Sequence, residues 1–402
     1  MAGVLDGIRV IDLSVWFQGP VAGQHLADFG AEVIHVERPQ GGDLGRGVRS
    51  IKALPVGDWN QYFLVINRNK KSLAVDLNKP AGRDILYKLV EVSDVFLSNL
   101  GKAALEKWGL AYDKLAAINP RLVYAVASGY GPRAQSVKPA FDMTVQALTG
   151  LMPRLGEPGQ PPIYVGMGSG DAMGGLMCAL GIMIALHARR QTGRGQFLDA
   201  SLYGAQLFMA APTLQGYLAG AEECGRQQSR SHPANALWNT YPTQDRWVFL
   251  CVPDTDADWT RLCATLEDPA LAADARFATA PARAANAAAL VERLETILAR
   301  RPAGEWTGRW RAAGLAASTI CDLSDLARDP QAWENQYLVE THCEEVQRQV
   351  VVRGLPVALA RTPGTVRHLG PELGQHTEEL LVDTLGYSWE QVGEFKEQGV
   401  IL

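Results

Sequence analysis

A short glycine-rich stretch around one carboxylate is the place where residue types and spacing offer chemistry. Asp171 is followed by an almost wholly apolar run that extends to Leu186. The surrounding glycines are Gly166, Gly168, Gly170, Gly174 and Gly175. Glycine outside an obvious turn marks a position where backbone or ligand must approach closely. An acidic residue at the head of an apolar helix is either a helix cap, stabilised by the helix dipole, or a reactive group.

The elements that position Asp171 are predicted from apolar periodicity. Branched apolar residues indicate strands over residues 7–14, 31–37, 94–98 and 122–128, with helices through 26–29 and over 84–91. Strand, helix, strand in that order predicts a parallel sheet with right-handed crossovers. We therefore expect an α/β, Rossmann-like domain. The loop Trp16–Pro20 lacks the GxGxxG pattern, so a dinucleotide held in the usual way is not expected.

The length predicts more than one domain. A chain of 402 residues exceeds what one hydrophobic core usually holds. The pattern of residue types changes between about residues 218 and 317. There, residues 247–252 are typical of a strand and residues 284–299 of an alanine-rich amphipathic helix. This predicts a smaller α+β domain. Two last helices are expected near 377–385 and 389–398.

Composition excludes several classes of protein. A net charge of -5 argues against a nucleic-acid binder. The first residues show no charged and then apolar leader, so we expect no signal peptide and a cytoplasmic location. The apolar run after Asp171 contains Gly181 and is shorter than the roughly 20 residues of a membrane span, which indicates a buried helix and no membrane partner. Histidines and cysteines show no metal spacing, so no metal is expected.

Motifs along nearly the whole chain resemble the family III CoA-transferases, the carnitine and formyl-CoA transferase group. The resemblance rests on Leu26 to Pro39, Gly42-Asp43 with Arg46, Asn67 to Leu77, Trp108 to Leu110, Asn119 to Tyr124, Gly129 to Gly131, Phe141-Asp142 with Gln146, Arg190 to Gln196, Thr362 to Arg367 and Leu373 to Glu379. These motifs are specific for the family and not for the substrate.

The resemblance implies an architecture and a nucleophile. It implies an interlocked homodimer in which residues 1–217 and 326–402 form the large domain and 218–325 the small one. The catalytic aspartate of such proteins lies in Gly-Asp-x-x-x-Gly, which here is Gly170-Asp171-Ala-Met-Gly174-Gly175 and assigns the role to Asp171. A carboxylate that attacks a thioester forms a mixed anhydride and releases CoA thiolate. The nucleophile must be ionised, and a helix N-terminus favours that. CoA is then a substrate, and no permanently bound cofactor is expected.

Basic residues are expected to bind the phosphates of CoA from loops at strand ends. The resemblance assigns this role to Arg38, Arg68, Lys70 and Lys71, with Gln18 beside them. Many relatives carry a CoA-contacting arginine where this chain has Gly101. Lys102 is the residue that offers a substitute charge, without bidentate geometry.

The expected acid pocket is lined by Trp16, Phe17, Gly170, Gly174 and Tyr130. Relatives that act on oxalate have glutamine where Phe17 stands, so an acid larger or more apolar than oxalate is expected. Two alternatives stay open. Related α-methylacyl-CoA racemases carry His-Asp where this chain has Phe141-Asp142, which disfavours a racemase. The other alternative is a non-catalytic CoA-binding subunit of a hetero-oligomer.

Overall fold

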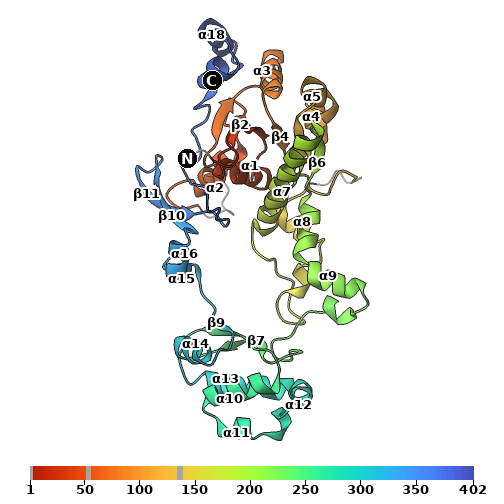
Figure 1. Ribbon diagram of the computed structural model, residues 1–402, viewed down its shortest axis with the longest axis vertical. Helices are drawn as coiled ribbons and strands as arrows, with labels where there is room; N and C mark the ends of the chain where they lie inside the picture. The colour runs from red at the N-terminus through yellow and green to blue at the C-terminus, as the bar shows by residue number, and fades with distance from the viewer. Residues whose placement is uncertain (1–2, 51–55, 134–138) are drawn as a thin grey trace. The chain divides into compact units, whose positions relative to one another are not determined.

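The chain forms two compact units. The computed structural model describes residues 3–50, 56–133 and 139–402. Unit 1 consists of Met1–Leu151, Tyr164–Ala211 and Pro330–Leu402, and unit 2 of Met152–Ile163 and Pro212–Asp329 (Figure 1). The sequence placed the boundaries after residues 217 and 325. It gave no sign that residues 152–163 leave the large unit.

Unit 1 is built on a six-stranded parallel sheet. The strands are β1 (Arg9–Leu13), β2 (Glu32–Glu37), β3 (Lys71–Ala74), β4 (Val95–Ser98), β5 (Val123–Val126) and β6 (Phe197–Asp199). Their order is β3-β2-β1-β4-β5-β6, and every neighbouring pair is parallel. This is the Rossmann order, in which the direction of winding reverses between β1 and β4. Ligands of such sheets bind beyond the carboxyl ends of the strands at that reversal.

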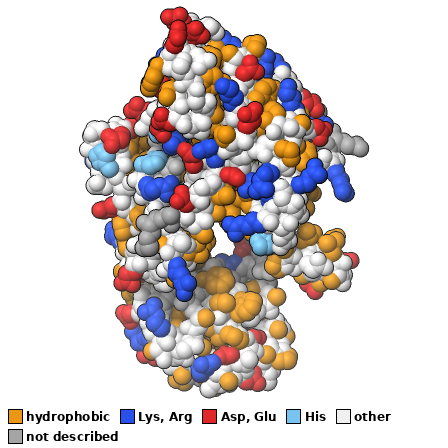
Figure 2. Space-filling view, turned by 45° about the horizontal axis from the view of Figure 1, so that its top comes forward, with side chains coloured by type: hydrophobic (Ala, Val, Ile, Leu, Met, Phe, Trp, Pro, Cys, Tyr) orange, Lys and Arg blue, Asp and Glu red, His pale blue; other side chains and the backbone are white. Residues whose placement is uncertain are grey.

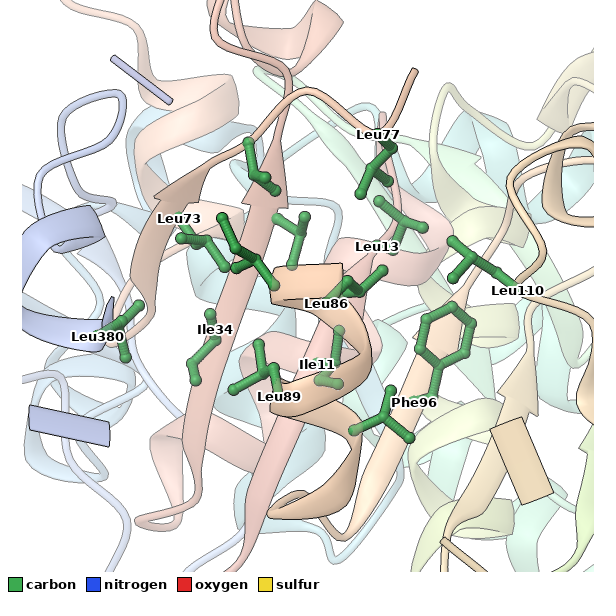
Figure 3. Packing of buried hydrophobic residues seen from close by; sticks show 14 of the residues in the cluster. Ile11, Leu13, Ile34, Leu73, Leu77, Leu86, Leu89, Phe96, Leu110 and Leu380 are labelled. Atoms are coloured by element: carbon green, nitrogen blue, oxygen red, sulfur yellow. The ribbon is translucent and has the colours of Figure 1, made fainter. Parts of the chain in front are cut away.

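Both faces of this sheet are covered by helices. The helices of unit 1 before its last segment are α1 (Gln18–Asp28), α2 (Gln61–Ile66), α3 (Pro80–Glu91), α4 (Lys102–Lys107), α5 (Tyr112–Ile118), α6 (Asp142–Gln146), α7 (Ser169–Thr192) and α8 (Leu202–Met209), with a 3-10 turn at Leu44–Ser50. Successive strand residues point to opposite faces. Ile11 therefore packs under Leu86 and Leu89 of α3 (Figure 3), whereas Val10 belongs to the core shared with α1 and α7.

The last segment of the chain completes unit 1. It contains α16 (Pro330–Glu334), the hairpin β10 (Leu338–Cys343) and β11 (Arg348–Arg353), α17 (Thr377–Glu379), a π-helical turn (Leu380–Thr384) and α18 (Trp389–Glu397). Leu380 lies in the same core as Leu73 of β3 (Figure 3). Ile401 forms a β-bridge with Val75, directly after β3. The sequence did not predict the hairpin.

Unit 2 is a small α+β unit. Its sheet has the antiparallel order β7-β8-β9, from β7 (Trp238–Pro242), β8 (Trp247–Cys251) and β9 (Ala317–Thr319). The helices are α9 (Ala211–Leu218), which begins at the boundary, α10 (Asp256–Leu266), α11 (Pro269–Ala272), α12 (Ala280–Ala285), α13 (Ala287–Leu298), α14 (Ala303–Ala312) and α15 (Leu323–Leu326), with 3-10 turns at Met152–Arg154, Glu222–Gly225 and Ala275–Phe277. The helix expected over 284–299 is present as α13, but it begins at Ala287, because Asn286 separates it from the end of α12.

Helix α7 is the longest element and has two unlike sides. Cys178, Ile182 and Leu186 lie in the core of unit 1, whereas Leu180 and Ile184 are exposed. By length and composition alone, α7 would be apolar enough to cross a membrane. Acidic and basic side chains are interspersed over the face in Figure 2, with apolar groups between them.

Candidate active site

Asp171 is the third residue of α7 and lies in its first turn. Gly168 occupies the N-cap with a φ of 79°, in the left-handed region that favours glycine. No side chain caps the helix, so the alternative of Asp171 as a helix cap is wrong. Its position in the first turn still exposes the carboxylate to the favourable end of the helix dipole.

The carboxyl group of Asp171 is half-buried and isolated. Across residues 3–50, 56–133 and 139–402, no hydrogen bond or ion pair reaches it. Burial and the charge of Asp142 raise the pKa of Asp171 to about 7. The sequence predicts an ionised, poorly solvated carboxylate at a helix start, and neither the degree of its burial nor the nearness of Asp142 can be inferred from local sequence.

Asp142 supports the turn that carries Asp171. Its Oδ1 accepts hydrogen bonds from the Gly170 N–H at 3.2 Å and from the side-chain amides of Gln146 and Gln206, both at 3.0 Å. Gln146 also accepts from the Val165 N–H at 2.9 Å, so it fixes the loop before α7. The sequence quoted Asp142 and Gln146 only as parts of motifs, because nothing local showed that α6 packs beside α7.

Tyr62 is a site residue that the sequence did not single out. Burial and the charges of Asp171 and Asp43 hold the pKa of its hydroxyl well above its usual range, so the hydroxyl is neutral and remains a donor. The rings of Tyr62 and Phe17 are 5.7 Å apart, and Phe17 lies against Gly168. The structure thus gathers Phe17 and Tyr62 at the first turn of α7. No motif around Tyr62 predicts this.

Two glycines of the expected pocket have a different role. A Cβ at Gly170 would overlap Gln206 and Asp142, and one at Gly174 would lie 2.7 Å from Gln18 Nε2. Both glycines are buried, so they make room for these side chains and not for a thioester. Gln18 is buried as well and donates to the Ala200 carbonyl at 3.2 Å. It therefore links α1 to the segment after β6 and packs against Gly174 of α7, where the sequence expected it beside CoA.

The remaining pocket residues lie on loops that follow β1 and β5. Trp16 has a φ of 66°, which a bulky residue adopts only under strain. The amide of Asn99 bonds the Val15 N–H at 2.9 Å and the Val15 carbonyl at 2.6 Å, which ties this loop to the end of β4. Tyr130 is half-buried, and its hydroxyl donates to the Pro139 carbonyl at 3.3 Å.

The predicted CoA-binding cations separate into two groups. Arg38 follows β2 and Lys102 follows β4, so both lie at the carboxyl edge of the sheet. Arg38 is exposed and donates to the Gly42 carbonyl at 3.2 Å, while the Lys102 side chain is 88% exposed and 3.7 Å from Glu106. Gly101 has open space around it. These two cations are accessible to an anionic ligand.

The second group, Arg68, Lys70 and Lys71, forms ion pairs within unit 1. Arg68 is fully buried against Asp28, at 2.7 Å, and Lys70 is fully buried against Asp12, also at 2.7 Å. Lys71 begins β3 and bonds Glu32 at 2.9 Å, at the amino edge of the sheet. These three cations were expected to bind the phosphates of CoA, but in the structure each forms an ion pair with a carboxylate of unit 1. Their partners lie 39 to 58 positions away in sequence, beyond the reach of a local pattern.

The described part of the chain shows no group of three His, Cys, Asp or Glu residues placed to hold a metal ion. The site of Asp171 therefore offers a carboxylate, a neutral phenol and apolar walls. This set suits acyl transfer through a covalent intermediate.

Comparisons with known proteins agree with the geometry. Succinyl-CoA–D-citramalate CoA-transferase of Chloroflexus aurantiacus is 32% identical, over 99% of this chain and 98% of its own. Succinyl-CoA:mesaconate CoA-transferase of Haloarcula hispanica is 32% identical, over 94% and 96%. The crystal structure of a CAIB/BAIF family protein from Brucella suis matches with a TM-score of 0.83 and 30% identity, over 95% of this chain and 100% of that one. The model of CoA-transferase family III matches residues 5–377, and the chain belongs to this family.

Proposed function

We propose that Asp171 is the nucleophile with which this CoA-transferase moves CoA from an acyl-CoA to a free carboxylic acid. The observation that carries the proposal is the isolation of its carboxylate, which is half-buried at a helix start and has no partner among the described residues. A carboxylate in an ion pair would be stabilised in its ground state. An unpaired one retains its nucleophilicity.

The proposed chemistry balances in three steps. A carboxylate oxygen of Asp171 attacks the thioester carbonyl carbon, the C–S bond breaks, and CoA leaves as the thiolate. The carboxylate of the acceptor acid then attacks the aspartyl carbonyl carbon of this anhydride, which expels the donor acid as its carboxylate and leaves the acceptor acid as a new anhydride with Asp171. Finally, CoA thiolate attacks the acyl carbon of the anhydride between Asp171 and the acceptor acid, which releases the new thioester and restores Asp171.

Oxyanion charge appears on the attacked carbonyl in each step. The hydroxyl of Tyr62, whose pKa is raised by burial and by the charges of Asp171 and Asp43, is neutral and can donate a hydrogen bond. Removing one donor of this kind typically costs about 2.7–4 kcal/mol of barrier. We therefore assign Tyr62 to stabilisation of that charge, with Phe17 as an apolar wall.

For CoA we propose Arg38 and Lys102 as the phosphate-binding cations, because both lie at the carboxyl edge and are exposed. The loop after Arg38 reaches Gly45, which packs against Tyr62. This loop therefore connects the phosphate end to the reacting end. CoA is a substrate in this scheme, and no resident cofactor takes part.

For the acids we propose succinyl-CoA as donor and a branched or unsaturated dicarboxylic acid as acceptor, since the relatives named above use D-citramalate and mesaconate. Trp16 and Phe17 agree with an acceptor larger than oxalate. The cytoplasmic location expected from the sequence stays a prediction.

We also propose that the active protein is a homodimer, as the resemblance implies. Leu176, Leu180 and Ile184 form an exposed apolar row on α7, at four-residue spacing. A second copy of the chain would cover it. Light scattering of the wild type and of Ile184→Lys tests this, and a wild-type monomer would contradict it.

The experiment that tests the nucleophile is covalent trapping. The enzyme is incubated with succinyl-CoA and hydroxylamine and then digested. A hydroxamate on the peptide that carries Asp171, absent without succinyl-CoA, is the expected result. A modified peptide elsewhere would remove Asp171 from this role. Proton exchange of a 2-methylacyl-CoA in heavy water without any acceptor acid would favour a racemase.

A further inference from the structure

The loop between β1 and α1 contains a residue in a strained conformation. This loop lies where the direction of winding reverses, between β1 and β4. Trp16 has a φ of 66°, in the left-handed region, where glycine fits without strain and a bulky side chain does not. Such strain persists only where the surrounding structure enforces it. Two neighbouring segments enforce it at Trp16.

The first constraint is Asn99, which directly follows β4. Leu13 of β1 and Ser98 of β4 are neighbours in the sheet, so the side chain of Asn99 reaches the chain just beyond the end of β1. Its Oδ1 accepts a hydrogen bond from the Val15 N–H at 2.9 Å, and its Nδ2 donates to the Val15 carbonyl at 2.6 Å. The amide of Asn99 therefore fixes both backbone groups of the residue before Trp16.

The second constraint is the start of α1. The Val21 N–H donates to the Phe17 carbonyl at 2.9 Å, which closes the first turn of the helix. Gly19 lies so close to the end of β1 that a Cβ there would be 2.4 Å from Ser14 Cβ. The reversal of the chain from β1 into α1 thus falls on Trp16, between two fixed segments.

The direction of Phe17 depends on this conformation, because Phe17 is the next residue. Its ring packs over the N-cap of α7, where a Cβ on Gly168 would lie 3.8 Å from it. The rings of Phe17 and Tyr62 are 5.7 Å apart. Phe17 therefore contacts the turn that carries Asp171.

We propose that Asn99 is a positioning residue for transfer, which holds Trp16 in its strained conformation so that Phe17 forms the wall against which the acceptor acid binds. The proposal rests on the proposed role of Asp171. A glycine at position 16 would remove the strain, but it would also leave the direction of Phe17 less restricted.

The strained conformation is tested by stability alone. Trp16→Gly and Trp16→Ala both remove the indole ring and differ in their tolerance of a positive φ. We expect the Tm of Trp16→Gly to be about 2–4 °C above that of Trp16→Ala. An equal or higher Tm of Trp16→Ala would overturn the inference, because alanine is the more stable of the two wherever φ is negative.

The role of Asn99 is tested by the kinetics of Asn99→Ala. We expect KM for the acceptor acid to rise about tenfold, while KM for the acyl-CoA changes by less than about twofold. An acceptor KM that stays unchanged, or that rises no more than the acyl-CoA KM, would contradict the proposal.

The matched control is Asn119→Ala. Asn119 is half-buried like Asn99, and its amide donates to the Val90 and Ser93 carbonyls at 3.0 and 2.8 Å, before β5 at the amino edge of the sheet. Its replacement should leave both KM values unchanged. An acceptor KM that rises equally in the two variants would reduce Asn99 to a structural residue.

A double-mutant cycle tests whether Asn99 acts through Phe17. If it does, kcat/KM of Asn99→Ala/Phe17→Ala should lie within about twofold of that of the more severe single variant. Losses that multiply would refute the link. Hydroxamate trapping at Asp171 is a separate measurement. If it failed, the proposed function would fall, while the Tm values of the two Trp16 variants would still report on the strained loop.

Discussion

Two aspartates of unit 1 show how the surroundings of one residue type decide its role. Asp12 lies at the end of β1, fully buried, 2.7 Å from Lys70 and 3.3 Å from His35. Burial alone would raise its pKa, but these cations hold it well below the usual range. Asp171 is half-buried with no cation beside it, and its pKa is raised. Paired carboxylates stabilise a fold, whereas an unpaired one is available for reaction.

The same division applies to the cations. Arg68 and Lys70 neutralise carboxylates in the interior, and Arg38 is exposed at the carboxyl edge. Residue type and loop position looked equivalent in the sequence. What distinguishes them is whether the cation already forms an ion pair with a carboxylate from another element.

The largest effect is expected from replacing Asp171, the unpaired carboxylate. Asp171→Asn should lower kcat/KM for transfer by on the order of 10³-fold or more, because it removes a bond formed only during the reaction. CoA binding, measured by calorimetry, should persist. Asp84→Asn, on the exposed side of α3, serves as the control. Activity within about tenfold of the wild type would show that Asp171 is not the nucleophile.

Disrupting the buried ion pair of Asp12 should lower the stability of the fold. Lys70→Met leaves Asp12 buried without its closest cation and should lower the free energy of unfolding by about 3–5 kcal/mol, measured in urea. Lys102→Met, at an exposed position, should change it by less than about 0.5 kcal/mol. Equal effects of the two substitutions would contradict the importance of the buried pair.

A pH titration sharpens the same point. Burial would lower the pKa of His35, but the carboxylates of Asp12 and Asp43, each 3.3 Å from the ring, and the charge of Glu37 raise it to about 9. Protonated His35 therefore stabilises the fold fully below pH 6.5, and this contribution of about 3 kcal/mol is lost as the pH rises through 9. Unfolding free energies of the wild type and His35→Gln should converge between pH 6.5 and pH 10. A constant difference would refute the assignment.

The smallest expected effect distinguishes a cation at the carboxyl edge of the sheet from one at its amino edge. Arg38→Ala should raise KM for the acyl-CoA about tenfold with kcat within about twofold. Lys71→Ala, at the amino edge between Glu32 and Glu379, should leave KM unchanged. The reverse result would return Lys71 to the CoA site and remove Arg38.

The parallel sheet was predictable because its signals are local. The predicted strands 7–14, 31–37, 94–98 and 122–128 correspond to β1, β2, β4 and β5, since branched apolar residues buried on both faces give continuous runs. The hairpin of β10 and β11 was missed, because half of its residues face solvent and Glu340, Arg348 and Arg353 among them are charged. Its pairing depends on one face packing on unit 1.

Asp171 was predictable from its glycines and its motif, but its surroundings were not. Asp142 and Tyr62 come from separate helices, and no spacing in the sequence relates them to Asp171. The pKa of Asp171 is raised first by burial and then by the like charge of Asp142 from α6, and neither cause is visible in the local sequence. Charge pairing between distant elements is a property of the tertiary fold.

The bridge between Val75 and Ile401 has a consequence for biosynthesis. The Asp76 N–H bonds the Val400 carbonyl at 2.8 Å, and Leu380, Val392 and Ile401 belong to the core beneath the first strands. A ribosome releases the amino-terminal half long before these residues emerge. The core of unit 1 therefore stays incomplete during synthesis, and the apolar surface of its nascent sheet remains exposed while unit 2 is translated. Shortening the chain by its last few residues would prolong that exposure indefinitely.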